Sequence, residues 1–420
     1  MTYILNPPGS LQATISLPAS KSISNRALVL HALSGSRTRP TNLSDCDDTQ
    51  VMIHALTGHP ADTVDIGAAG TAMRFLTAYL SVTPGTRLLT GSRRMQQRPI
   101  ALLVEALRSL GAQIEYAGQE GFPPLRITGD IPLAGGEVSL AGNVSSQYIS
   151  ALLMIGPVLP HGLKLRLTGD IISRPYIDLT LQLMKDFGAL AAWTSPKDIE
   201  VRPGGYRDTP FRVEGDWSAA SYWYEIMALC LQRENGPKEN CEIELSGLFA
   251  HSLQGDSHGA ELFARLGVHT RFTSQGVKLS PGAEAATRLD ADLVDIPDLA
   301  QTFVVTCCLM GIPFRFTGLQ SLKIKETDRL NALIHELRKL GYVLQCEQDS
   351  ILSWEGERCP ALPSPVVATY EDHRMAMAFA PACIKIPGLR IAHPEVVSKS
   401  YPHFWDDLRK AGFQIEEGEE

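Results

Sequence analysis

The chain has 420 residues, of which 44% are hydrophobic and 20% charged, so it can bury a large core and is neither disordered nor fibrous. Its formal net charge is -8, and Lys and Arg are spread along the sequence, which argues against nucleic-acid binding through a general basic surface. We see no secretory signal and no apolar stretch long enough for a membrane span. We therefore expect a cytoplasmic protein without nucleic-acid or membrane partners.

The eight cysteines lack the spacing of a metal site. None stands in a C-x-x-C motif, and Cys307 and Cys308 lie inside the apolar run Val304–Leu309. This distribution predicts reduced core cysteines and neither disulfides nor a bound metal.

One pattern recurs along the chain: an amphipathic helix that ends at a glycine and is followed by a polar hairpin. A glycine directly after the last helical residue is a common helix stop because it adopts positive φ at little cost. Successive glycines of this kind stand 77, 79, 74 and 71 residues apart. They are Gly111, Gly188, Gly267, Gly341 and Gly412.

A second recurrence alternates with the first: a turn rich in Gly, Ser and Asp opens a strongly apolar helix. Each unit thus has one helix apolar enough to be buried and one that can cover a surface. Six such α/β units predict two lobes of three rather than one large sheet. The six openings are Ser20–Arg26, Gly67–Thr71, Gly142–Gln147, Glu214–Ser218, Asp295–Asp298 and Tyr370–Arg374.

The first unit is short, because Gly58 stands only nine residues before Gly67, whereas Gly111 and Gly142 are 31 apart. About one hairpin is therefore expected to be missing. The segment 3–17 alternates like strands and is a candidate to supply pairing elsewhere, which places both termini in the second lobe. We assign residues 20–213 to the N-terminal lobe and residues 1–19 with 214–420 to the C-terminal lobe.

The helix openings are candidate anion sites, since free backbone N–H groups and the helix dipole attract negative charge. For each opening taken alone, simple N-capping explains the residues as well. Basic residues beside these openings favour phosphate or carboxylate binding, although each alone is typical of a solvated surface. These residues are Lys21, Arg26, Arg98, Lys325, Arg329, Arg374 and Lys399.

Glu326 and Asp298 are carboxylates among these bases, a setting suited to proton transfer. A helix N-terminal carboxylate serving the dipole is an equal alternative for Glu326. His373 is a possible base, but its neighbours Asp372 and Arg374 make a structural role equally reasonable. The chain has no P-loop, dinucleotide fingerprint or G-x-S-x-G elbow, which argues against a kinase, dehydrogenase or triad hydrolase.

Seven motifs, in order and across essentially the whole chain, resemble those of the EPSP synthase (5-enolpyruvylshikimate-3-phosphate synthase) family of enolpyruvyl transferases. The resemblance implies an α/β fold of two lobes, each of three βαβαββ-like repeats in an inside-out α/β barrel, with the active site in the interlobe cleft. The motifs are SKSISNR at 20–26, GTAMR at 70–74, RPI at 98–100, SSQ at 145–147, SRPYID at 173–178, KETDR at 325–329 and DHRMAM at 372–377.

By this resemblance, the enzyme moves the enolpyruvyl group of phosphoenolpyruvate to the 5-hydroxyl of shikimate 3-phosphate, with Lys21, Asp298 and Glu326 as catalytic residues. It implies a monomer without cofactor or metal, whose partners are these two small molecules. Shikimate 3-phosphate would contact Lys21, Ser22, Arg26, Ser145, Ser146, Gln147, Ser173, Tyr176, Asp298, Ser321 and Lys325. Phosphoenolpyruvate would contact Lys21, Gly70, Arg98, Gln147, Arg329, Arg374 and Lys399.

Three residues depart from the family pattern: Ala68 and Ser321 stand where Asn is frequent, and Phe75 stands where Pro is common. The resemblance also implies competition by glyphosate at the phosphoenolpyruvate site, with Gly70 leaving room for the inhibitor. Two alternatives remain, namely a UDP-N-acetylglucosamine enolpyruvyl transferase and a noncatalytic anion-binding protein of the same fold. The loop Met95–Arg98 lacks the Cys or Asp of the former, and the intact set of catalytic residues argues against the latter.

Overall fold

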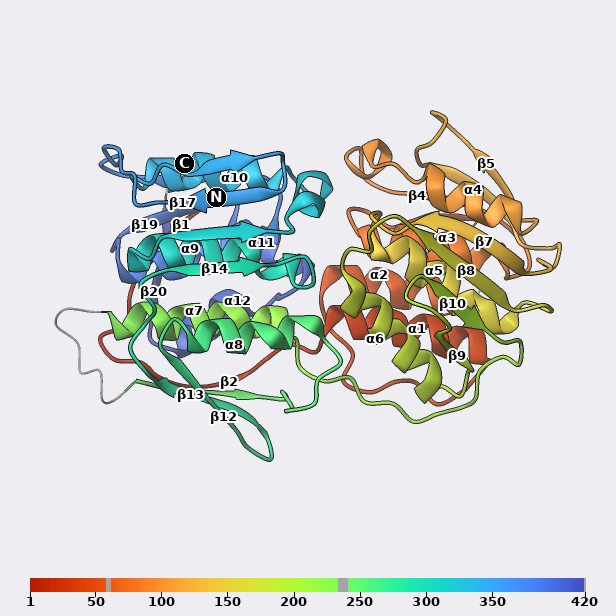
Figure 1. Ribbon diagram of the computed structural model, residues 1–420, viewed down its shortest axis with the longest axis horizontal. Coiled ribbons are helices and arrows are strands. Elements are labelled where there is room, and N and C mark those ends of the chain that lie inside the picture. The colour runs from red at the N-terminus through yellow and green to blue at the C-terminus, as the bar shows by residue number, and fades with distance from the viewer. Residues whose placement is uncertain (58–61, 233–240, 419–420) are drawn as a thin grey trace. The chain divides into compact units, whose positions relative to one another are not determined.

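The computed structural model describes residues 1–57, 62–232 and 241–418 (Figure 1). The chain divides into two compact units, an N-terminal unit formed by Ala19–Val213 and a C-terminal unit formed by Met1–Pro18 with Glu214–Glu420. Five four-stranded sheets and the helices packed on them make up the two units. The expected α/β fold of βαβαββ-like repeats is confirmed.

Two sheets of the N-terminal unit repeat one topology. In each, two parallel strands joined by a helix are followed by a second helix and an antiparallel hairpin that adds to the same edge. The first comprises β3 (Thr63–Asp65), α3 (Gly70–Ser81), β4 (Thr86–Thr90), α4 (Ala101–Ser109), β5 (Gln113–Tyr116) and β6 (Leu125–Thr128). The second comprises β7 (Gly136–Ala141), α5 (Ser146–Ile155), β8 (Leu163–Thr168), α6 (Arg174–Asp186), β9 (Ala191–Trp193) and β10 (Asp198–Val201).

The first repeat of this unit has helices but no sheet between Ala19 and Thr57. It consists of α1 (Lys21–Ser34) and α2 (Asp47–Leu56), together with an isolated parallel bridge between Thr41 and Arg212. Gly58, which marked the short first repeat in the sequence, lies outside the described residues.

Three sheets of the C-terminal unit follow the same plan, and two of them include a strand from the N-terminal segment. The fourth repeat contains α7 (Trp217–Leu231), β11 (Glu242–Ser246), α8 (Gly259–Ala264), β12 (Val268–Phe272) and β13 (Gly276–Pro281). The fifth contains β14 (Leu289–Asp292), α9 (Ala300–Met310), β15 (Phe314–Thr317), α10 (Arg329–Lys339), β16 (Gln345–Glu347) and β17 (Ile351–Trp354). The sixth contains β18 (Val366–Val367), α11 (His373–Phe379), β19 (Leu389–Ala392), α12 (Phe404–Lys410) and β20 (Gln414–Gly418).

The N-terminal segment supplies the two missing strands, as its alternating pattern predicted. β1 (Thr2–Asn6) pairs antiparallel with both β19 and β20, and β2 (Gln12–Ser16) pairs parallel with β11. Thr2 lies opposite Gly418, so both ends of the described chain meet in one sheet (Figure 1). The C-terminal unit therefore closes only when residues from the two ends of the sequence combine.

The five glycines that predicted helix ends all have positive φ, between +85° and +102°. Each follows an amphipathic helix, and a non-glycine residue is strained in this conformation. The prediction of these helix stops is confirmed.

Buried helices form the core of each unit, with the sheets packed around them. In the N-terminal unit, α1, α3 and α5 contact one another, and in the C-terminal unit α9 contacts both α7 and α11. Every residue of α9 and α11 is buried. The start of each of these helices carries polar or charged side chains, so each core ends in a polar surface.

The prediction that all eight cysteines are core residues is only partly right. Cys46, Cys230, Cys307, Cys308 and Cys383 are buried. Cys346 is exposed, since β16 is an edge strand of its sheet, and Cys241 and Cys359 are half-buried. Within the described parts of the chain, no helix combines the length and the apolar character needed to cross a membrane.

The pairing of β2 with β11 yields a first test. Ile15 is buried in the C-terminal core opposite Leu245, whereas its neighbour Thr14 is exposed on the other face of the strand. We expect Ile15→Ala to lower the free energy of unfolding by about 3 kcal/mol, because it removes buried methyl groups and leaves a cavity. Chemical denaturation measures this loss. The control Thr14→Ala should change stability by less than about 0.5 kcal/mol, and equal effects of the two variants would contradict the pairing.

Candidate functional site

Asp298 is the centre of a charged cluster in the C-terminal unit. Its carboxylate accepts from Arg374 Nη2 at 2.8 Å, from Arg329 Nη1 at 3.3 Å and from Lys325 Nζ at 3.4 Å. The residue lies in the short 3₁₀ helix Pro297–Leu299 that leads into α9. A carboxylate is thus held among three cations at the end of a buried helix.

Arg329 connects this carboxylate with two others. It is 1% exposed, and it donates through Nε to Asp372 at 2.7 Å and through Nη2 to Glu326 at 2.9 Å. Burial disfavours the charge of Arg329, but the negative charges of Asp372, Glu326 and Asp298 raise its pKa above the ordinary value. Glu326 also accepts from Lys399 Nζ at 2.9 Å.

Helix capping explains how the sequence places these groups. Asp372 caps the N-terminus of α11 by accepting from the backbone N–H of Arg374 at 2.9 Å, and Asp328 caps α10 by accepting from that of Asn331 at 3.2 Å. Arg329 and Arg374 are consequently in the first turns of their helices. The cap of α11 is at the same time a partner of Arg329, which ties two helix starts together.

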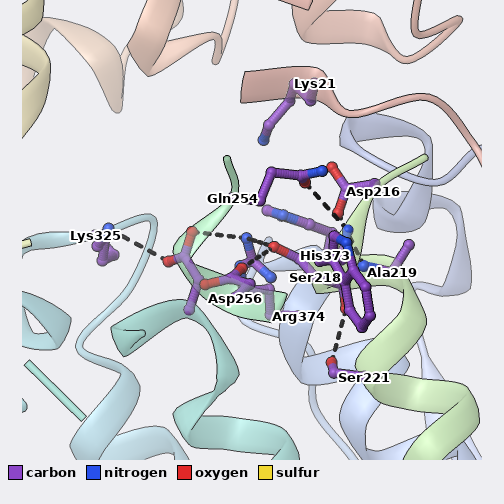
Figure 2. A network of polar contacts seen from close by, with 12 residues as sticks. Lys21, Asp216, Ser218, Ala219, Ser221, Gln254, Asp256, Lys325, His373 and Arg374 are labelled. Carbon is purple, nitrogen blue, oxygen red and sulfur yellow. Dashed lines mark hydrogen bonds and ion pairs between the residues drawn. The ribbon is translucent and has the colours of Figure 1, made fainter. Parts of the chain in front are cut away.

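Three polar residues of this cluster were not predicted as site residues. Arg374 Nη2 donates to Ser218 Oγ at 3.4 Å, and Arg374 Nη1 donates to Tyr222 OH at 3.5 Å. Ser218 in turn donates to the carboxylate of Asp256 (Figure 2). Ser218 and Tyr222 are four residues apart on α7 and so share one face. This spacing is visible in the sequence and could have indicated that the two residues act together. Asp256 lies in the 3₁₀ helix Gly255–His258, whose contact with α7 no local pattern reveals.

Burial makes Asp256 an unusual carboxyl group. It is 5% exposed. Burial first, and then the negative charge of Asp298, raises the pKa of Asp256 to about 7, although Arg374 opposes the shift. Its charge therefore changes near neutral pH, in contact with residues that hold Asp298.

Arg26 is the main buried cation of the N-terminal unit. It is 2% exposed, and it donates to Thr180 Oγ1 at 2.7 Å, to Ser150 Oγ at 3.1 Å and to the carbonyl of Ser22 at 2.9 Å. Burial lowers its pKa to about 10. The Phe75 ring, one of the departures from the family pattern, lies 5.3 Å from the guanidinium carbon and supports it.

Lys21 begins α1 and is only slightly exposed. Its Nζ lies 3.5 Å from the carboxylate of Asp48 on α2. Ser20 caps the same helix by accepting from the N–H of Ile23 at 3.5 Å. The first turn of α1 therefore presents a lysine whose position is fixed by the neighbouring helix.

Gly70 and Arg98 are in close contact at the start of α3. A Cβ atom on Gly70 would lie 2.7 Å from Arg98 Nη1, so only glycine lets this guanidinium lie against the helix. At the start of α5, Gln147 Nε2 donates to Thr71 Oγ1 at 3.1 Å, and Ser145 caps the helix. Residues from the starts of α3 and α5 are thus side by side.

The remaining expected site residues have less distinctive surroundings. Ser173 precedes α6 with a left-handed φ of 55°, and the carbonyl of Tyr176 accepts from Arg26 at 3.5 Å and from Thr180 at 2.8 Å. Ser146, the first residue of α5, is buried. Ser321 Oγ is buried and makes no hydrogen bond with the described residues. The structure therefore brings Asp298, Lys325, Glu326, Arg329, Arg374 and Lys399 into one cluster, and Ser321 adds no bond to it.

Comparison with known proteins identifies the family. The model of the family described as EPSP synthase (3-phosphoshikimate 1-carboxyvinyltransferase) matches residues 5–58 and 57–408. The 3-phosphoshikimate 1-carboxyvinyltransferase of Bacteroides fragilis is 66% identical over 420 residues, covering both chains completely. The enzyme of the same name from Escherichia coli is 35% identical over 433 residues, covering 97% of this chain and 98% of the relative.

Solved structures show the same fold. EPSP synthase from Acinetobacter baumannii aligns with a TM-score of 0.77 at 21% identity, over 99% of this chain and all of that one. The enolpyruvyl transferase NikO from Streptomyces tendae aligns with a TM-score of 0.72 at 16% identity, over 99% and 98% of the two chains. The fold is thus that of enolpyruvyl transferases. The chain belongs to the EPSP synthase (3-phosphoshikimate 1-carboxyvinyltransferase) family, which confirms the expectation from its seven motifs.

The described residues contain no group of three or more His, Cys, Asp or Glu side chains arranged to hold a metal ion. The acidic residues of the C-terminal cluster are instead paired with Lys and Arg.

The raised pKa of Asp256 predicts a pH-dependent stability. An Asp has a pKa near 3.9 in the unfolded chain, so the folded protein binds a proton more tightly, and this contribution to stability is lost as the pH rises through about 7. Between pH 5 and pH 8, the wild type should lose about 2 kcal/mol of unfolding free energy that Asp256→Asn keeps. The stability of the variant relative to wild type should therefore rise by this amount. Chemical denaturation at both pH values measures the difference.

The same substitution at the exposed Asp292 is the matched control. We expect Asp292→Asn to differ from wild type by a similar small amount at pH 5 and at pH 8. A difference for Asp256→Asn that does not change with pH would contradict the raised pKa.

Proposed function

We propose that this chain transfers the enolpyruvyl group of phosphoenolpyruvate to the 5-hydroxyl of shikimate 3-phosphate and releases phosphate, with the residues of the two clusters in the roles given below. Family membership supports the reaction. The observation that supports the roles is the C-terminal cluster, where Asp298 and Glu326 are each held between cations. Such an arrangement provides both anion binding and proton transfer in one place.

Phosphoenolpyruvate binding requires positive charge that its carboxylate and phosphate can use. Arg329, Arg374 and Lys399 are paired with protein carboxylates in the structure, so the substrate would share these cations with Asp298 and Glu326. We assign phosphoenolpyruvate to these three residues together with Lys21, Gly70, Arg98 and Gln147.

Shikimate 3-phosphate binding falls mainly to residues of the N-terminal unit. Ser22, Ser145, Ser146, Gln147, Ser173 and Tyr176 lie at the starts of α1, α5 and α6, where hydroxyl and backbone N–H groups suit a phosphate. Arg26 is deeply buried, so we assign it two roles. It binds shikimate 3-phosphate directly, and it places a positive charge beneath this site. From the C-terminal unit, Asp298, Ser321 and Lys325 complete the set.

The chemical steps follow from the charges around two carboxylates. As the 5-hydroxyl oxygen attacks C2 of phosphoenolpyruvate, Asp298 takes the proton of that hydroxyl, and Glu326 in its protonated form gives its proton to C3. In the tetrahedral intermediate, loss of a C3 proton to Glu326 restores the double bond as the phosphate departs. Lys21 stabilises the negative charge on the leaving phosphate.

We further propose that the enzyme works as a cytoplasmic monomer without a cofactor or metal. The acidic pI of about 5.8 and the local placement of the basic clusters support small anionic substrates as its partners. A phosphate-release assay in the presence of a chelator tests the metal independence directly.

Removing one cation of the proposed site tests the roles. We expect Lys21→Ala and Arg98→Ala each to lower kcat/KM by roughly 100-fold or more, since a charged donor contributes about 3 kcal/mol to transition-state stabilisation. Phosphate release that depends on both substrates is the measurement, with UDP-N-acetylglucosamine as an acceptor that should give none. Lys197→Ala, at an exposed lysine of the same unit, is the control. Near-normal turnover of both site variants would overturn the assignment.

Glyphosate tests the contact between Gly70 and Arg98. We expect competitive inhibition against phosphoenolpyruvate, and we expect Gly70→Ala to weaken inhibition more than it raises the KM for phosphoenolpyruvate. The added Cβ would push Arg98 away and fill space beside the helix start, and the flexible end of Arg98 can move to accommodate it. Inhibition constants for both proteins at varied phosphoenolpyruvate measure the effect. Equal inhibition constants for the two proteins would show that Gly70 does not line the inhibitor site.

A further inference from the structure

Two consecutive residues before α11 have a strained backbone. Tyr370 and Glu371 have φ of 55° and 56°, in the left-handed region that non-glycine residues disfavour. They come just before Asp372, which contacts Arg329, and Arg374, which contacts Asp298. Such a conformation persists only where surrounding contacts enforce it.

Glu336 provides contacts that hold this segment. It lies on α10 and is 0% exposed, yet it accepts four hydrogen bonds from three protein donors. Its Oε1 accepts from Tyr370 OH at 2.6 Å, and its Oε2 accepts from the backbone N–H of Ala368 at 3.0 Å. Lys339 Nζ donates to both oxygens, at 2.9 and 2.7 Å, and also to the carbonyl of Val366 at 3.0 Å.

One face of α10 therefore holds the segment at both of its ends. Arg329 stands seven residues before Glu336, two helical turns or about 10 Å along the axis. Arg329 binds Asp372 at the end of the segment, while Glu336 and Lys339 bind residues 366–370 before it. The left-handed pair Tyr370–Glu371 lies between these two points of attachment.

We infer that Glu336 is a positioning residue for the transfer reaction, because it fixes the segment 366–371 and through it the placement of Asp372 and Arg374. The inference rests on the proposed function, in which Arg374 binds phosphoenolpyruvate. Glu336 is fully buried, and the partners of its carboxylate all donate to it. A buried carboxylate is tolerated only with such complete hydrogen bonding.

The chemistry of the carboxylate explains why glutamine cannot replace it. The Ala368 N–H and the Lys339 ammonium can only donate, and Lys339 donates to both carboxylate oxygens, whereas Tyr370 OH can also accept. In Glu336→Gln the amide NH₂ points at one of these donors in either orientation, so at least one contact is lost. Tyr370→Phe removes a single contact and leaves the others in place, and because Tyr370 is 39% exposed the change does not disturb the core.

The test compares the KM values for the two substrates. We expect Glu336→Gln to raise the KM for phosphoenolpyruvate roughly tenfold, which corresponds to about 1.4 kcal/mol, and Tyr370→Phe to raise it by a smaller factor. The KM for shikimate 3-phosphate should stay within about twofold, because most of its proposed ligands lie in the N-terminal unit. The double variant should be no worse than Glu336→Gln, since both changes act on one network.

Tyr224→Phe is the matched control. It removes a different tyrosine hydroxyl of the C-terminal unit, whose hydrogen bond to Thr270 Oγ1 is 3.0 Å, and Tyr224 lies outside the segment 366–374. We expect both its KM values to match those of wild type. A purely structural role for Glu336 would lower stability and affect both substrates alike.

Hydrogen exchange supplies a readout without activity. The Ala368 amide is bonded to Glu336, so peptides covering 366–374 should exchange faster in Glu336→Gln and Tyr370→Phe, and not in Tyr224→Phe. The inference would be overturned if exchange in 366–374 were unchanged, or if the KM for phosphoenolpyruvate were no higher than in the control. If Glu336→Gln does not fold, Tyr370→Phe still provides both measurements. A wild type that shows no activity dependent on phosphoenolpyruvate would instead contradict the proposed function.

Discussion

The C-terminal site depends on one buried guanidinium. Arg329 is 1% exposed and is bonded to three carboxylates that come from three different places in the chain: Asp298, Glu326 and Asp372. An unpaired charge buried at this depth would be strongly destabilising, so Arg329 needs its three carboxylates. Arg329 in turn holds the three carboxylates in place. The planar fork of arginine allows this, because its N–H groups point in fixed directions toward several acceptors. Lysine at position 329 would not hold three partners in these positions.

The repeat architecture explains why such a cluster forms at all. Each repeat contributes one buried helix, and a buried helix must leave its first N–H groups to a cap, a neighbouring side chain or a ligand. Asp216, Asp328 and Asp372 serve as caps, and the last of these also binds Arg329. Folding therefore uses the same helix starts to which we assign anion binding, and in that proposal a substrate anion adds to an arrangement that capping has already organised.

Local signals and long-range contacts differ in what the sequence reveals. The glycine helix stops and the strand pattern of residues 3–17 are local, and both predictions are confirmed because positive φ and alternating burial depend on few neighbours. Asp256 and Tyr222 were missed because their contacts join α7 to the distant 3₁₀ helix Gly255–His258 and to α11. The seven motifs identified the family, yet they did not indicate that Arg26 is almost completely buried against Thr180 and Ser150.

The charge balance of the C-terminal cluster depends on a residue that the motifs do not contain. Lys325, Arg329, Arg374 and Lys399 face Asp298, Glu326 and Asp372, which leaves one positive charge in excess when Asp256 is protonated. Ionisation of Asp256 cancels that excess, and its pKa of about 7 places the change near neutral pH. Because Ser218 connects Asp256 to Arg374, the proton on Asp256 acts on the cation assigned to phosphoenolpyruvate. A proton on Asp256 therefore adds to the attraction of this cluster for an anion, and burial is what favours that proton.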